Sequence, residues 1–142
     1  MRLRNGTKIA IIGGGPAGSF FAHFAFVYAK QRGIEISVTI FEKKDFAQKG
    51  AAGCNMSAGV LSENLLEKLS EQNIRIPPPC VQQEIKGYFL QVPDYGVPLH
   101  YPHPSHKTRI ITVFRGSGPR FVSHDASESF DYFLLEHARS LG

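Results

Sequence analysis

Residues 13–18, with the sequence GGGPAG, form a pattern that could bind phosphate. Gly13, Gly15 and Gly18 have the spacing G-x-G-x-x-G and follow the apolar run of residues 8–12. In such a motif the first glycine permits a tight turn, the second lets the backbone approach a pyrophosphate, and the third lets a helix pack closely on a strand. The helix that follows directs unpaired N–H groups at the phosphates. These residues therefore predict a site for an adenine dinucleotide.

An acidic residue stands where this kind of site needs one. Residues 36–41 (ISVTIF) predict a second strand, and Glu42 follows it, 24 positions after Gly18 and near the expected separation of about 20. A carboxylate here accepts hydrogen bonds from ribose hydroxyls and repels a 2′-phosphate, which favours FAD or NAD over NADP. Lys43 and Lys44 come next and could contact phosphate, although solvated loop lysines are the simpler interpretation.

A strand–helix–strand unit must position both parts of this site. The crossover from about Ser19 to Arg32 is helical in pattern and ends at Gly33. It is unusually aromatic, which predicts burial on more than one face, while His23 is interpreted as a helix residue with no ligand role. The aromatic residues are Phe20, Phe21, Phe24, Phe26 and Tyr28. The pattern favours a Rossmann-like βαβ start, with a glycine-rich turn in a non-binding α/β fold as the alternative.

The rest of the chain predicts a helix, a small β region and a last helix. Ser62 is the expected N-cap of the first of these helices. Its apolar positions are Leu61, Leu65, Leu66 and Leu69. Prolines at 77–79 mark a break. Strands are expected at 87–92, 97–101 and 109–114, with turn residues at 93–96, and a helix with one buried face at 129–140.

Composition places the chain among globular α/β proteins and argues against several functions. The 142 residues are 42% apolar with a net charge of +4, and the basic residues are scattered, so no nucleic-acid partner is expected. Mild basicity is compatible with peripheral membrane contact but does not argue for it. Glycines and Pro16 interrupt the apolar N-terminal stretch, which disfavours a secretion signal or a spanning helix and favours the cytoplasm.

Cysteines and histidines predict neither a redox pair nor a metal site. Cys54 and Cys80 are the only cysteines and are too far apart for a C-x-x-C pair. His100, His103 and His106 are three residues apart, but prolines interrupt them and no acidic residue is near. A loop with incidental histidines is therefore preferred over a metal site.

Three segments together resemble a known family. They are the glycine-rich turn with Glu42, residues 53–61 (GCNMSAGVL) and residues 129–138 (SFDYFLLEHA), in this order. The chain is similar in them to FAD-dependent oxidoreductases of the geranylgeranyl reductase type, within the flavin hydroxylase-like superfamily. The second segment looks like that family's Cys-Gly-Gly loop near the flavin, and the third resembles its Phe-Asp-x-x-Leu-x-x-x-Ala helix. The family often has an arginine three residues before Phe-Asp, where this chain has Ser127, with Arg115 and Arg120 as nearby substitutes.

The resemblance implies an enzyme that reduces a hydrophobic, isoprenoid-like alkene through a two-electron flavin cycle. FAD is the implied cofactor, NAD(P)H is a candidate electron donor, and no residue is assigned as catalytic. The expected cofactor-binding residues are Gly13, Gly15, Pro16, Ala17, Gly18, Glu42, Lys43 and Cys54. A flavin monooxygenase on the same scaffold and a non-catalytic dinucleotide-binding module are the alternatives.

The resemblance also implies an organisation of the chain. Residues 1–80 would form an FAD-binding Rossmann-like segment, 81–122 a β excursion toward a substrate domain, and 123–142 a helix returning to the FAD-binding domain. Flavoproteins of this type carry a second FAD-contacting Gly-Asp motif far downstream, and none precedes Gly142. We therefore expect an incomplete domain that by itself binds FAD weakly or not at all. Substrate and oligomeric state are left open.

Overall fold

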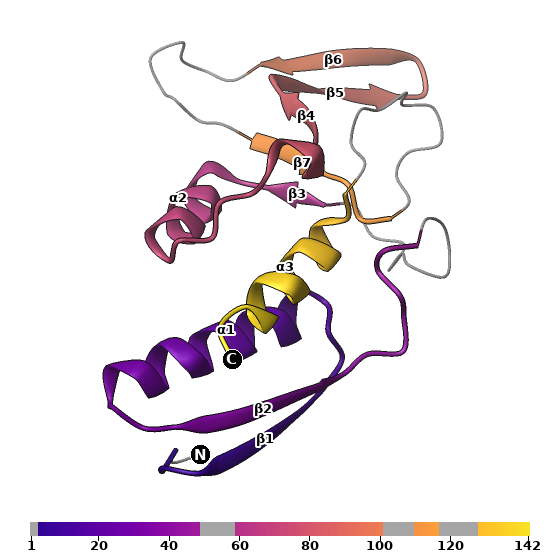
Figure 1. Ribbon diagram of the computed structural model, residues 1–142. Coiled ribbons are helices and arrows are strands. Elements are labelled where there is room, and N and C mark those ends of the chain that lie inside the picture. Colours follow the sequence, from indigo (N-terminus) through magenta and orange to yellow (C-terminus); the bar gives the residue numbers. More distant parts are fainter. Residues whose placement is uncertain (1–2, 49–58, 101–109, 117–127) are drawn as a thin grey trace.

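The computed structural model describes residues 3–48, 59–100, 110–116 and 128–142, and they form a mixed α/β structure (Figure 1). The helices are α1 (Pro16–Gln31), α2 (Glu63–Glu71) and α3 (Phe130–Arg139), with a 3₁₀ turn at Pro78–Cys80. The strands are β1 (Thr7–Ile12), β2 (Ile36–Phe41), β3 (Val60–Leu61), β4 (Val81–Ile85), β5 (Gly87–Val92), β6 (Tyr95–His100) and β7 (Ile110–Val113). The expected α/β class is confirmed at this level.

The first unit is β1-α1-β2, and its two strands pair in parallel along their whole length. Ile9 and Ile11 point to one side of β1 and are buried against Ala22 and Ala25 of α1, because alternate strand residues face opposite sides. The helix begins at Pro16, earlier than expected. A proline suits the first helical position, since its fixed φ is helical and its missing N–H would be unpaired there anyway.

The buried positions of α1 are occupied by small residues, with His23 as the exception. Ala22, Ala25 and Ala29 are buried, whereas Phe21, Phe24 and Tyr28 are each close to half exposed. The expectation that aromatic side chains would be buried on more than one face is therefore wrong for these three. Small side chains let the helix lie close to the strands, so the larger ones are directed outward.

A second unit consists of an antiparallel sheet in the order β3-β7-β4 with α2 and α3 packed on it. Its buried core is formed by Leu61, Leu69, Ile74, Ile111, Val113, Phe130 and Leu134. Helix α3 belongs to both units, because Phe130 and Leu134 lie in this core while Ala138 lies in the core of the first unit. Figure 1 shows α3, in yellow, between the two. The packing of α3 therefore joins the two cores.

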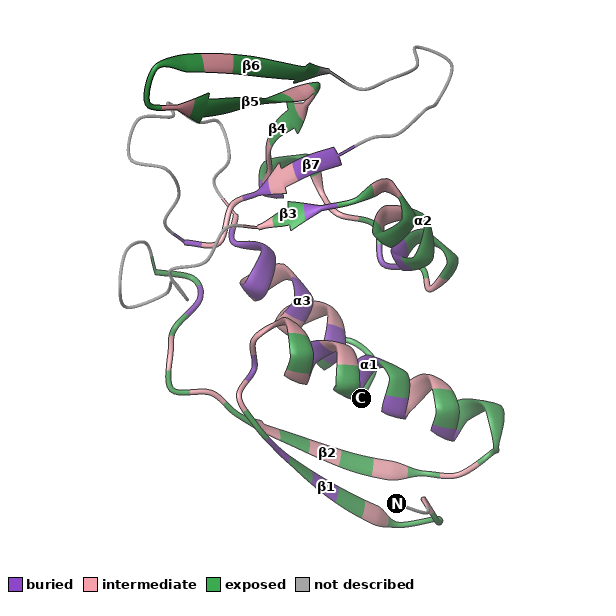
Figure 2. Cartoon of the chain, turned by 180° about the vertical axis from the view of Figure 1, so that it is seen from behind, coloured by how far each residue is buried: buried purple, intermediate pink, exposed green. Residues whose placement is uncertain are grey.

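Strands β5 and β6 form a separate hairpin with an apolar face. Residues opposite one another in the ladder share a face, and one face carries Tyr88, Leu90, Val92, Tyr95, Val97 and Leu99. All but Val92 are exposed, as the green colouring of the hairpin in Figure 2 shows. On the opposite face Phe89 is 63% exposed and lies over Gly96. An apolar surface of this kind is typical of a region that contacts a partner or a hydrophobic ligand.

Three local predictions need correction. Leu61 lies in β3, not at the start of a helix, because it pairs with Ile111 of β7. Strand β6 begins at Tyr95, so the turn is the two residues Pro93 and Asp94 rather than 93–96. Strand β4 was not expected and pairs with β7 through an irregular register. Each of these pairings depends on a strand distant in sequence or on turn geometry.

No helix in the described part of the chain combines the length and the apolarity that crossing a bilayer requires.

Candidate functional site

The glycine-rich turn and Glu42 lie together at the carboxyl ends of β1 and β2. Because the two strands are parallel and in register, Ile12 is paired with Phe41, and the residues after them are neighbours. The Gly13 N–H donates to the carbonyl oxygen of Phe41 at 2.8 Å. Ligands of open α/β sheets bind outside the carboxyl ends of the strands, which is where these groups are.

Two of the motif glycines are required by the fold itself. Gly13 has a φ of +101°, a conformation that L side chains rarely adopt. A Cβ atom on Gly18 would overlap the carbonyl oxygen of Gly13 and lie 3.1 Å from its carbon, so α1 could not approach the turn as closely as it does. These two glycines therefore have the conformational and packing roles that their spacing predicts.

Gly15 differs, because its backbone conformation does not require glycine. It is the N-cap of α1 with φ −66° and ψ −176°, which any residue adopts. Gly15 has no side chain that could cap α1, and the first turn contains no acidic residue. Within the described ranges, the N–H groups at the positive end of the helix are therefore not occupied by a capping side chain. The presence of glycine at position 15 would be explained by a ligand that binds close to the backbone there.

The Glu42 carboxylate binds the backbone of the glycine-rich turn and can still accept further hydrogen bonds. Its Oε2 accepts a 2.6 Å hydrogen bond from the Gly14 N–H, and its Oε1 accepts a 2.8 Å bond from the Lys44 N–H. An ionised carboxylate has about four lone-pair positions, so about two remain after these bonds. Two vicinal ribose hydroxyls would supply two donors.

Ser19 is a positioning residue that the sequence pattern did not single out. Its hydroxyl is buried and donates a 2.8 Å hydrogen bond to the carbonyl oxygen of Gly14. Gly14 itself is enclosed, with Leu135 of α3 3.3 Å from where its Cβ would be. The turn is thus fixed by α1, by Glu42 and by α3 together. The only sequence signal for Ser19 was a hydroxyl residue directly after Gly18.

A hollow of about 320 Å³ adjoins Glu42. It lies between β2 and the end of α3, and its lining includes Ile40, Phe26, Leu135 and Arg139. Volumes of this order are those of small-molecule sites, and a lining of mixed apolar and polar groups that includes one acid and one cation suits a partly polar ring system.

The remaining predicted cofactor residues are placed only in part. Pro16 and Ala17 are the first two residues of α1, and both Ala17 and Lys43, which follows Glu42, are exposed. Cys54 lies outside the described residues. So do His103 and His106, and nothing is described of the His100 side chain.

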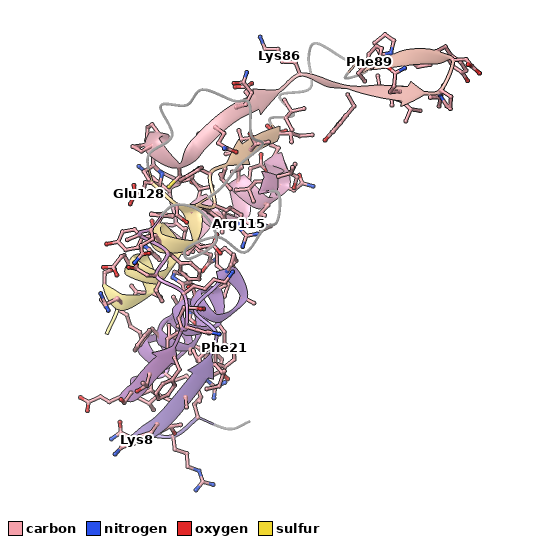
Figure 3. All side chains as sticks on the ribbon, turned by 90° about the vertical axis from the view of Figure 1, so that its right-hand side faces the viewer. Lys8, Phe21, Lys86, Phe89, Arg115 and Glu128 are labelled. Carbon is pink, nitrogen blue, oxygen red and sulfur yellow. The ribbon has the colours of Figure 1, made fainter. Side chains whose placement is uncertain are left out.

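Arg115 forms a buried ion pair with Asp131 at the start of α3. Its Nε donates to Oδ2 and its Nη2 to Oδ1, each at 2.7 Å, and Asp131 is only 1% exposed. Figure 3 shows Arg115 in the middle of the molecule, between α3 and the hairpin that bears Phe89. Of the arginines considered for the Phe-Asp helix, Arg115 is thus the one placed beside that aspartate, whereas Arg120 lies outside the described residues.

Two histidines from distant parts of the chain also meet. His137 Nε2 of α3 lies 3.2 Å from His23 Nδ1 of α1. Burial lowers the pKa of His23, and the nearby His137 lowers it further; burial also lowers the pKa of His137. The sequence predicted His23 to be an ordinary helix residue with no ligand role. It gave no indication that His23 would contact His137, which lies 114 positions further along the chain.

Cys80 is predicted to be chemically inert in the native protein. Burial raises the pKa of its thiol to about 12, and Glu128 adds to the effect. Because only the thiolate reacts, the lower thiolate fraction should slow alkylation by iodoacetamide at pH 8 on the order of a thousandfold relative to a free thiol. Mass spectrometry of peptides that separate Cys80 from Cys54 measures this. Rapid native labelling of Cys80 would contradict it, and labelling in denaturant is the control.

Within the described ranges, no three His, Cys, Asp or Glu side chains converge as a metal site would require. Comparison with protein-family models gives no match to this sequence, and comparison with curated proteins gives none either.

Proposed function

We propose that this chain is the dinucleotide-binding part of an FAD-dependent oxidoreductase with a Rossmann-like βαβ start. The observation that carries the proposal is the Glu42 carboxylate, which touches the glycine-rich turn at 2.6 Å and keeps lone pairs for a ribose. The turn would hold the pyrophosphate through backbone N–H groups and the positive end of α1.

The residues present fit the adenosine diphosphate half of such a cofactor. Gly15 has no side chain that would separate the backbone from a phosphate, Glu42 offers acceptors to ribose hydroxyls, and the hollow beside Glu42 would receive the ring system. The negative charge of Glu42 disfavours a 2′-phosphate, which supports FAD or NAD rather than NADP at this position. When bound, FAD would supply two-electron redox chemistry, and the protein would orient it.

A hydrophobic substrate is the class that the surface supports best. The apolar face of the β5–β6 hairpin and the outward aromatic side chains of α1 would both favour a ligand with little polarity. We therefore propose reduction of a hydrophobic, isoprenoid-like alkene, the reaction that the resemblance to geranylgeranyl reductases implies.

Replacing Glu42 by glutamine should weaken binding of ADP-ribose by on the order of tenfold to a hundredfold, because a charge-assisted hydrogen bond becomes a neutral one. NMR titration to millimolar ligand, observing the amides of residues 13–18, measures the affinity even if it is weak. Glu35→Gln is the matched control, since Glu35 is an exposed acid before β2, at the opposite end of the strand from Glu42. No saturable shift in the native chain, or an equal loss in both variants, would refute the assignment.

A second experiment tests the redox part of the proposal. In protein that retains FAD through desalting, the visible spectrum of the bound flavin should bleach on addition of a reductant and recover on addition of a hydrophobic alkene. Oxygen consumption coupled to hydroxylation would point instead to a monooxygenase. A bound flavin that cannot be reduced would argue against both enzymes and would support the alternative of a non-catalytic dinucleotide-binding module.

A further inference from the structure

The contact between His23, which is buried, and His137, which is partly exposed, joins the two helices. His23 is 3% exposed, and the edge of its ring meets Phe24 at 5.1 Å between centroids. The ring of His137 lies 6.1 Å from that of Phe133. The His23 Nε2 atom is buried and has no hydrogen-bond partner among the residues that the structure describes. The pair is therefore a polar contact in an apolar setting.

The 3.2 Å contact can hold one hydrogen between the two facing nitrogens, and no more. With neutral rings, either His137 Nε2–H donates to His23 Nδ1 or the reverse, and the contact is a normal hydrogen bond. When both rings are protonated, two N–H groups face each other and two positive charges adjoin. The buried Nε2 of His23 then also carries a hydrogen that has no acceptor. The contact does not survive double protonation.

Charged groups on the surrounding elements do not neutralise the pair. On α3, Glu136 pairs with Arg139 at 2.9 Å and Asp131 pairs with Arg115. On α2, Lys68 pairs with Glu71; on β2, Glu42 binds backbone N–H groups; and Lys8 of β1 is exposed. Among the described residues, His137 is the one ionisable group that shifts the pKa of His23 through its charge.

The His23–His137 pair lies near the C-terminal end of α3, where α3 packs against α1. His137 precedes Ala138, the α3 residue buried in the β1-α1 core, whereas Phe130 and Leu134 are buried in the other core. The contact therefore holds the end of α3 on α1.

We propose that His23 and His137 form a pH-sensitive latch, which holds the C-terminal half of α3 against α1 at neutral pH and releases it on acidification.

The direction of the effect follows from proton uptake. Burial lowers the pKa of both imidazoles in the closed state, so the closed state binds fewer protons than an open state in which the rings are solvated near pKa 6.5. Acidification below about pH 6.5 therefore favours opening. For each proton taken up, the opening constant should rise about tenfold per pH unit until the closed state also titrates.

Hydrogen–deuterium exchange between pH 5.5 and 7.5, corrected for the intrinsic rate at each pH, tests the latch on the 142-residue chain. We expect protection of the α3 amides to fall about tenfold between pH 6.5 and 5.5, while β2 amides change little. An unchanged α3, or an equal loss in α3 and β2, would overturn the proposal, because the latter is general acid unfolding.

His137→Gln provides the decisive variant, since its amide can still donate to His23 Nδ1 but does not titrate. In this variant only His23 of the pair still takes up a proton on opening, so the protection of α3 should fall less steeply on acidification than in the native chain. A pH dependence equal to that of the native chain would overturn the proposal. His23→Asn is the corresponding variant on α1. If neither variant folds, the contrast between α3 and β2 in the native chain decides.

Discussion

Replacing Gly18 by alanine is expected to lower the free energy of unfolding by at least about 4 kcal/mol, a loss at the extreme of single substitutions. The new Cβ would overlap the carbonyl oxygen of Gly13, which is a backbone atom and cannot rotate away. Relief requires α1 to move away from the turn, which would also open the contact of Ala22 and Ala25 with Ile9 and Ile11. Urea unfolding followed by circular dichroism measures the loss.

Gly15→Ala is the matched control for this prediction. Both glycines belong to the same motif, but Gly15 has an ordinary φ and caps the helix, so alanine there should cost only about 1 kcal/mol. Under the proposed function, Gly15→Ala should instead weaken ADP-ribose binding while the chain stays folded. Equal stability losses in the two variants would show that the close approach at Gly18 is not what holds α1 in place.

Replacing Asp131 by asparagine is expected to lower the free energy of unfolding by about 3–5 kcal/mol. The substitution removes the negative charge from a buried pair in which the carboxylate accepts two 2.7 Å hydrogen bonds from the Arg115 guanidinium. Asp131 also stands in the first turn of α3, where a negative charge interacts favourably with the helix dipole. Because α3 contributes to both cores, we expect the loss to appear as one cooperative shift of the urea transition.

Glu136→Gln is the control for Asp131→Asn, since it breaks an acid–arginine pair on the same helix. The Glu136–Arg139 pair is exposed, so its loss should change the free energy of unfolding by less than about 1 kcal/mol. If Asp131→Asn lowers the free energy of unfolding as little as Glu136→Gln does, the buried pair does not stabilise the packing of α3 against the rest of the chain.

Local sequence determined the elements that form the candidate site. The strand before Gly13, the helix after it and the strand before Glu42 all follow from apolar runs and glycines within a few residues of one another. Ser62 was predicted as an N-cap and its hydroxyl accepts from the Leu65 N–H. Parallel pairing then brings Gly14 and Glu42 into contact, so the spacing of the motif located this part of the site.

Other features were decided only by tertiary structure. Leu61 has the spacing of a helix residue but pairs with Ile111 in a strand, because the ladder with β7 outweighs local propensity. The aromatic residues of α1 predicted burial on more than one face, whereas Phe21, Phe24 and Tyr28 are close to half exposed. Which side of α1 is buried depends on how closely alanines let the helix approach β1.

The sequence by itself determined the glycine turn, the acid after the second strand and the Ser62 cap, since each depends on backbone conformation or hydrogen bonds within a few residues. Tertiary structure alone decided that Arg115 pairs with Asp131, that His23 meets His137, and that α3 joins two cores. These contacts link residues 16 and 114 positions apart. Their formation depends on the packing of whole elements, for which no short segment carries a signal.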